Sequence, residues 1–419
     1  MLTALLSLQA CHKDPDKMKE DRFNHVLILY SAGCNDLSSY LQSDIRDIID
    51  AGATLPKKQS GKAFIIVTQK RNGDRATSPY IIRARRTSKK GYIVCDTLRT
   101  LPAGMQIADP DVMHDVLSYI RTSFPSDKYG MVFSSHSTGW LPKGYYDRPR
   151  GSVFSSSKVF GLDGKEIKKD EPASGVIPYY EKSYPDGIPV KSIGRGELPA
   201  QEGVYEMDLK EFADAIPMQM EYILFDVCFF GGVEAAYELK DKAKLIGASQ
   251  AEVLADGFVY RNIISRLMDE YDPEAVCRDY YERHEMMTGL NKSATISLIR
   301  TSELDKLASV CRGLFSKYRK QMDMVNADNV QRFFRFDKHW FYDLEDIMVQ
   351  SGISEEDLIQ LKLALKGCVA YEAHTEMFMN AFKIRTSCGL SMYLPCMGSG
   401  ELDDFYRNLA WNRASGLVE

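Results

Sequence analysis

The sequence predicts an α/β fold in which helices cover both faces of a mostly parallel central sheet. From residue 25 onward, short apolar runs rich in β-branched residues alternate with amphipathic stretches, the order typical of such a fold. The short runs are apolar on both faces, as buried parallel strands are. With 419 residues, of which 44% are hydrophobic, the chain can supply a large core.

Seven runs are the predicted strands. They cover residues 25–31, 62–68, 91–95, 129–135, 221–227, 244–249 and 294–299. Between them, Asn35 can cap a helix that runs to about Ile49, and Pro110 can open one that ends near Thr122. Three further helices are expected at 208–211 onward, 234–242 and 258–268.

Beyond residue 300 the pattern becomes mainly helical, over 303–324 and 355–371, and the run 389–394 is a candidate for one more strand of the sheet. We therefore expect three parts. They are a signal and tether at 1–22, a catalytic α/β domain at 23–300, and a mainly helical C-terminal region at 301–419 packed on that domain. The segment 141–206 is rich in Pro, Gly, Lys and Arg and lacks periodicity, so it is expected to be a functional loop or a surface insertion.

The N-terminus has an apolar run from Leu2 to Ala10, which is too short to span a bilayer. Ala10 and Cys11, followed by a polar stretch, resemble the end of a bacterial lipoprotein signal, although the usual basic start is missing. On this interpretation Cys11 carries lipid, and the protein is exported and anchored at the outer membrane or cell surface. The alternative is a frayed terminus with an accidental cysteine.

The net charge of −5, with 26% charged residues, does not favour nucleic-acid or other polyanion binding. The nine cysteines include no CxxC pair and no Cys/His spacing typical of zinc, so no metal site is expected. Most of them lie in apolar stretches and are expected to be small buried side chains.

The octapeptide FSSHSTGW at 133–140 allows two chemistries. If Ser137 were the nucleophile of a serine esterase, it would need a strand–turn–helix elbow, but Pro142 and Gly144 follow within one turn. The candidate late histidines, His339 and His374, lie in helical patterns that favour a structural role. The context therefore favours His136 as the reactive residue.

A thiol partner lies at the end of another predicted strand. Asp226-Val227-Cys228 ends this strand, and a Gly-Gly turn and a helix follow. Chemistry in open α/β sheets gathers at the carboxyl ends of strands, where both His136 and Cys228 fall. A thiol near a helix start and a histidine can become a thiolate near neutral pH, which is an activated nucleophile. The structural alternative is that Cys228 is simply a buried residue at a strand end.

Several motifs in order resemble the clostripain-like cysteine peptidases, family C11, which have a caspase-like αβα sandwich. The resemblance covers most of the chain after residue 24. The motifs are YSAGCNDL at 30–37, SDKYG at 126–130, SHSTGW at 135–140, FDVC at 225–228, VE at 233–234, YEL at 237–239, ASQ at 248–250 and GLSMYLP at 389–395.

The resemblance implies an endopeptidase in which His136 is the general acid and base and Cys228 the nucleophile. It implies that Asp226 lies in the S1 pocket and selects Arg or Lys at P1, with Ser249 and Gln250 in the pocket wall. Asp226 could instead orient His136 or bond only to the backbone. The family usually has Gly after the catalytic His, and the backbone N–H groups of that residue and of Cys228 are expected in the oxyanion hole; here the position is Ser137.

Family members often mature by cutting themselves at basic residues between His and Cys, so self-cleavage is expected within 141–206. No cofactor is required for the chemistry, and although calcium stimulates some relatives, no EF-hand-like loop supports it here. Peptides with Arg or Lys at P1 are the expected partners. A catalytically inactive, peptide-binding lipoprotein with the same fold is the alternative function.

Overall fold

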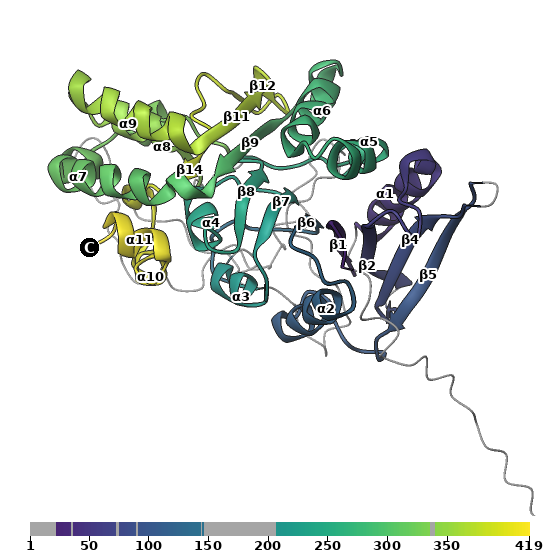
Figure 1. Cartoon of the computed structure of the whole chain (residues 1–419). Helices are drawn as coiled ribbons and strands as arrows, with labels where there is room; N and C mark the ends of the chain where they lie inside the picture. Colours follow the sequence, from purple (N-terminus) through teal and green to yellow (C-terminus); the bar gives the residue numbers. More distant parts are fainter. Residues whose placement is uncertain are drawn as a thin grey trace, which may run out of the picture.

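The computed structural model describes residues 22–34, 37–72, 75–88, 91–143, 145, 207–335 and 340–419. Over these ranges the chain builds a ten-stranded sheet in the order β11-β9-β8-β7-β6-β1-β2-β4-β5, with β3 (Arg75–Ala76) paired to β2 (Figure 1). Five neighbouring central strands are parallel: β8 (Ala243–Ala248), β7 (Met220–Asp226), β6 (Tyr129–Ser134), β1 (His25–Gly33) and β2 (Lys62–Asn72). Antiparallel strands flank them: β9 (Thr295–Arg300), β11 (Val369–His374), β4 (Tyr80–Arg86) and β5 (Ile93–Thr100).

Helices cover both faces of this sheet (Figure 1). One face carries α1 (Ser38–Asp50), α5 (Tyr260–Ile264) and α6 (Pro273–Glu285), and the other carries α2 (Pro110–Ser123), α3 (Leu209–Asp214) and α4 (Val233–Glu238). Every residue of β1 and β6 is buried, as expected for strands covered on both faces. The predicted α/β class with a mostly parallel central sheet is thus confirmed.

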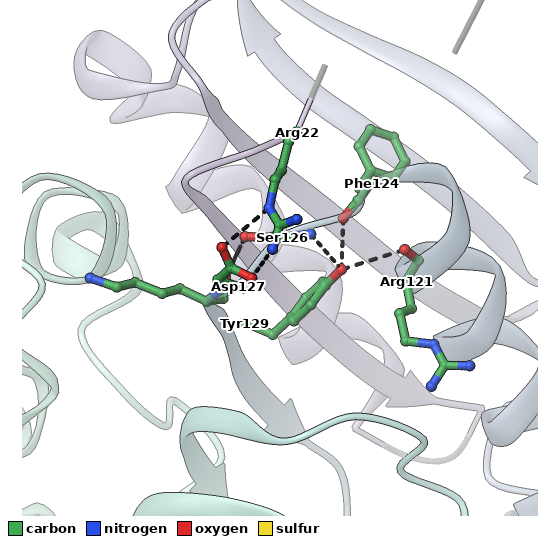
Figure 2. A network of polar contacts seen from close by, with 7 residues as sticks. Arg22, Arg121, Phe124, Ser126, Asp127 and Tyr129 are labelled. Atoms are coloured by element: carbon green, nitrogen blue, oxygen red, sulfur yellow. Dashed lines mark hydrogen bonds and ion pairs between the residues drawn. The ribbon is translucent and has the colours of Figure 1, made fainter. Parts of the chain in front are cut away.

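A small polar network fixes the turn that leads into β6 (Figure 2). The hydroxyl of Tyr129 accepts the backbone N–H of Ser126 at 2.9 Å and donates to the carbonyl of Phe124 at 2.8 Å. At the surface beside it, Arg22 donates from Nε to the carboxylate of Asp127 at 3.2 Å. These contacts tie the first residue of β6, Tyr129, to the turn after α2.

The C-terminal region is mainly helical, as expected. Its helices are α7 (Leu304–Asp323), α8 (Leu344–Gln350), α9 (Glu355–Cys368), α10 (Gly400–Tyr406) and α11 (Ala410–Ser415). Two expectations for this region were wrong. The helix expected over 355–371 ends at Cys368 and continues directly into β11, so His374 lies on a strand. The run 389–394 contains only β14 (Ser391–Met392), which pairs with β10 (Tyr342–Asp343) and not with the central sheet.

Some predictions concern residues outside the described ranges. They are the lipid-bearing Cys11, the helix cap Asn35, His339 and most of the 141–206 segment. In the part of the chain that the structure describes, no helix is both long and apolar enough to cross a membrane.

Candidate active site

His136 and Cys228 follow two strands that lie next to each other in the sheet. β6 and β7 are parallel, and their register pairs Ser134 with Asp226. His136 and Cys228 each come two residues after this pair, so both leave the sheet at the same edge and at the same level. Neighbouring strands are about 4.8 Å apart. The adjacency predicted from two strand ends is therefore present in the backbone.

Cys228 is fully buried, and its sulfur faces the segment that follows β8. The backbone N–H of Val253 donates to Cys228 Sγ at 3.0 Å, and the Val253 carbonyl lies 3.7 Å from the same sulfur. The next residue, Phe229, has a φ of 59°, a left-handed conformation that is uncommon for a bulky side chain. Its N–H donates to the carbonyl of Ala251 at 2.9 Å, which ties the turn after Cys228 to the same segment.

The loop after His136 packs against that turn. Gly139 has a φ of 64°, and a Cβ added there would lie 2.4 Å from the carbonyl oxygen of Phe229. A side chain at residue 139 would thus separate the two loops. Ser137 is partly exposed, and its hydroxyl accepts the N–H of Gly139 at 2.9 Å. The Ser137 side chain thereby serves the turn of its own loop.

Asp226 is fully buried at the end of β7. Its Oδ2 accepts hydrogen bonds from the hydroxyl of Tyr260 at 2.5 Å and from that of Ser134 at 3.1 Å. Burial, and then the negative charge of Asp226, hold the pKa of Tyr260 well above its ordinary value, so Tyr260 remains a donor. The carboxylate is therefore held in place by two neutral hydroxyls at the edge where His136 and Cys228 emerge.

Ser249 and Gln250, the expected pocket wall, are fully buried and bonded within the protein. The Ser249 hydroxyl lies 2.7 Å from that of Thr295. The Gln250 amide donates to the hydroxyl of Ser297 and to the carbonyl of Gly389, both at 2.7 Å. These side chains connect the end of β8 to β9 and to the C-terminal region.

Two buried carboxylates make long-range contacts that the sequence pattern did not predict. Glu252 forms a bidentate ion pair with Arg335, although 83 residues separate them. Glu234, in the first turn of α4, accepts the backbone N–H of Tyr393 and the hydroxyl of Tyr406. Both partners come from the C-terminal region, so periodicity around either carboxylate could not reveal the contacts.

Among the described residues, no group of three or more His, Cys, Asp or Glu side chains is arranged to hold a metal ion.

The chain is similar to known proteins in sequence and in fold. The family model described as the clostripain family, peptidase C11, matches residues 29–169 and 199–406. None of the curated proteins compared matches the chain. Among solved structures, an inactive zymogen of a C11 protease from Parabacteroides distasonis is 22% identical, with a TM-score of 0.72 over 94% of this chain and 98% of that one.

A secreted C11 cysteine protease from Bacteroides thetaiotaomicron is 20% identical, with a TM-score of 0.71 over 94% of this chain and 99% of that one. A secreted C11 protease from the same organism, in complex with an irreversible peptide inhibitor, is 19% identical, with a TM-score of 0.69 over 94% and 98% of the two chains. At these identities the likeness shows a shared fold, while the family model covers most of the sequence. The chain belongs to the clostripain family of C11 cysteine proteases.

Proposed function

We propose that the protein is an endopeptidase that cleaves after Arg or Lys through a dyad of Cys228 and His136. The observation that carries this proposal is the register of β6 and β7, which delivers both residues to one edge of the sheet. Family membership supports the reaction class.

In the proposed reaction His136 takes the proton of the Cys228 thiol, and the thiolate attacks the scissile carbonyl carbon. The C–S bond forms while the carbonyl oxygen becomes an oxyanion. His136 then donates its proton to the leaving amine as the C–N bond breaks. Water, deprotonated by His136, hydrolyses the acyl-enzyme and releases the thiol.

The oxyanion would be bound by the backbone N–H groups of Ser137 and Cys228. A backbone donor survives the replacement of the family's glycine by Ser137, since it requires only a suitable backbone conformation. The hydrogen bond between the Ser137 hydroxyl and Gly139 supports a fixed conformation of this loop. The serine esterase alternative gains no support, because no helix follows Ser137 within the described residues of this loop.

Selection of Arg or Lys is assigned to Asp226, with the segment of Ser249 and Gln250 as the pocket wall. A buried carboxylate held by neutral hydroxyls stabilises a cationic side chain strongly and a neutral one weakly. The two hydroxyls bond to Oδ2 and fix the orientation of the Asp226 side chain at this edge of the sheet.

The maturation and anchoring proposals rest on sequence alone. We assign 23–300 to the catalytic domain and 301–419 to a region packed on it, and we place self-cleavage within 141–206. The basic residues of that loop include Arg148, Arg150, Lys168, Lys169, Lys182, Lys191 and Arg195. Lipid on Cys11 would anchor the exported protein, and loss of labelled-palmitate incorporation in Cys11→Ser tests it.

The dyad is tested by turnover of peptide reporters ending in Arg or Lys. We expect loss of activity in Cys228→Ala and His136→Ala, and retention in Ser137→Ala and in Cys95→Ala, a control at an exposed cysteine. Loss only in Ser137→Ala would support esterase chemistry instead. Absence of turnover in every variant and in wild type, even after the loop is cut, would support the peptide-binding alternative.

The same proteins test maturation and specificity. Wild type should be clipped between residues 141 and 206 and Cys228→Ala should stay intact, whereas identical clipping of both would exclude self-cleavage. Asp226→Asn should lower kcat/KM for Arg and Lys reporters by about a hundredfold while sparing a neutral P1 reporter. An equal loss on all reporters would show that Asp226 orients the dyad and does not select the substrate.

A further inference from the structure

Arg335 and Glu252 form an ion pair in the interior, close to the proposed nucleophile. Arg335 Nε lies 2.5 Å from Glu252 Oε2, and Arg335 Nη2 lies 3.0 Å from Oε1. The two side chains are 3% and 0% exposed. A buried pair of this kind is weak evidence for stability, since desolvation offsets its attraction, but its fork-to-fork geometry fixes orientation.

What the pair orients is the peptide unit bonded to the sulfur. Glu252 directly precedes Val253, whose N–H donates to Cys228 Sγ at 3.0 Å. A hydrogen bond donated to sulfur favours the thiolate over the thiol. Once its carboxylate is held at both oxygens, Glu252 has little freedom to rotate, and neither has the N–H that follows it.

The segment around Arg335 holds the nucleophile from a second side. Phe334 lies 5.1 Å from Phe229, ring centre to ring centre, and Phe341 stacks on Phe229 at 4.7 Å with an angle of 6° between the rings. Phe229 is the left-handed residue after Cys228. The aromatic contacts therefore restrain the turn after the cysteine, while Arg335 restrains the segment to which its sulfur is bonded.

We propose that Arg335 is a positioning residue for Cys228, acting through Glu252 to hold the Val253 N–H against the sulfur and so favour the thiolate. The proposal rests on the assigned role of Cys228 as nucleophile. In this assignment Arg335 acts through Glu252 and not on the substrate.

The test compares Arg335→Met and Glu252→Gln with wild type in the full-length protein. Alkylation of Cys228 by iodoacetamide is followed against pH by mass spectrometry of the peptide that contains this residue, which separates it from the other cysteines. We expect the pH of half-maximal alkylation to rise by about one pH unit in both variants. In reporter turnover we expect kcat to fall about tenfold with KM within about twofold.

A matched control is Arg266→Met. Arg266 also holds a carboxylate at both oxygens, that of Asp279, at 3.0 Å for each contact, but this pair joins the segment after α5 to α6 and does not involve the peptide unit bonded to Cys228 Sγ. This variant should keep the wild-type alkylation profile. Arg335→Lys, which retains the charge without the fork, should fall between wild type and Arg335→Met.

The two single variants separate positioning from simple charge. Removal of Arg335 leaves a negative charge near the sulfur, whereas removal of the Glu252 charge leaves a positive one. Shifts in opposite directions would mean that net charge acts on the thiolate and would overturn the proposal. An unchanged alkylation profile in both folded variants would mean that the ion pair is purely structural. A lowered KM in Arg335→Met would mean that Arg335 occupies the place of the substrate's cationic side chain. Either result also overturns the proposal.

If a single variant fails to fold, the double variant Glu252→Leu/Arg335→Met removes both charges and is expected to fold. It should still show the raised pH of alkylation, and a wild-type profile would refute the proposal. The alkylation measurement needs no turnover. A wild type without peptidase activity would therefore contradict the proposed function without deciding the role of Arg335.

Discussion

The buried carboxyl group of Glu234 is expected to make the stability of the protein depend on pH. The side chain is fully buried in the first turn of α4, and its Oε1 accepts the N–H of Tyr393 at 2.8 Å and the hydroxyl of Tyr406 at 2.7 Å. Burial raises the pKa of Glu234 from 4.5 to about 7, although the two hydrogen bonds act in the opposite direction. Desolvation thus outweighs the bonds that favour the charged form.

The sign and the magnitude follow from this pKa. Between pH 4.5 and about 7 the folded protein binds more protons at Glu234 than the unfolded chain does, so the free energy of unfolding falls as the pH rises. At 1.36 kcal/mol for each pH unit, the full effect is about 3 kcal/mol. The stabilisation is complete below pH 4.5 and is lost as the pH passes about 7.

Glu234→Gln tests this expectation, because glutamine keeps an acceptor oxygen and resembles the protonated carboxyl. We expect wild type and variant to differ little at pH 4, and the variant to be more stable by about 3 kcal/mol at pH 8. Urea unfolding from pH 4 to pH 8, in a Cys228→Ala background that prevents self-cleavage, gives the difference. Glu238→Gln, which removes a partly exposed carboxylate from the same helix, is the matched control.

Other groups that titrate, such as Asp343, contribute equally to both proteins and cancel in the difference. A difference that is constant from pH 4 to pH 8 would refute the reasoning. So would a wild type that gains stability relative to the variant as the pH rises.

Three further predictions concern the site. Gly139→Ala forces a side chain against the Phe229 carbonyl at positive φ and should lower kcat/KM by about tenfold or more. Full activity would show that the loop after His136 need not contact the turn after Cys228. Ser137→Gly should keep turnover within about twofold of wild type, whereas turnover by Ser137→Pro, which lacks the backbone N–H, should fall by about a hundredfold or more. Equal turnover by the two variants would exclude the N–H of residue 137 from the oxyanion hole. Tyr260→Phe removes a hydrogen bond to the Asp226 carboxylate, worth about 1.5–3 kcal/mol. It should lower kcat/KM for Arg and Lys reporters more than for a neutral reporter. An equal effect on both kinds of reporter would show that this bond does not contribute to specificity.

The central strands were predictable because each is a short apolar run buried on both faces. β4 was not predicted, since its sequence YIIRARR places three arginines in an antiparallel strand near the sheet edge, where solvent can reach them. β11 was hidden because it follows α9 without a break in the apolar pattern. Periodicity cannot show where a helix becomes a strand when neither proline nor a turn separates them.

The sequence was sufficient to predict that His136 and Cys228 lie at the ends of two strands on one edge of the sheet, because parallel strands bring their carboxyl ends to the same edge. It was not sufficient for what surrounds the sulfur. Arg335 lies in a segment without periodicity, and its contact with Glu252 depends on how the C-terminal region folds back. Pairing over such a distance is a property of tertiary structure, which local patterns do not encode.

The folding of the chain onto the turn after Cys228 also has a consequence during synthesis. The Gly231 carbonyl accepts the N–H of Ser391, so this hydrogen bond cannot form until residue 391 has left the ribosome. At about 5–20 residues per second, the interval between the synthesis of Cys228 and that of Ser391 lasts on the order of ten seconds. Throughout this interval the nascent chain lacks one of the hydrogen bonds that hold the turn after Cys228, so this part of the site is completed only late in translation.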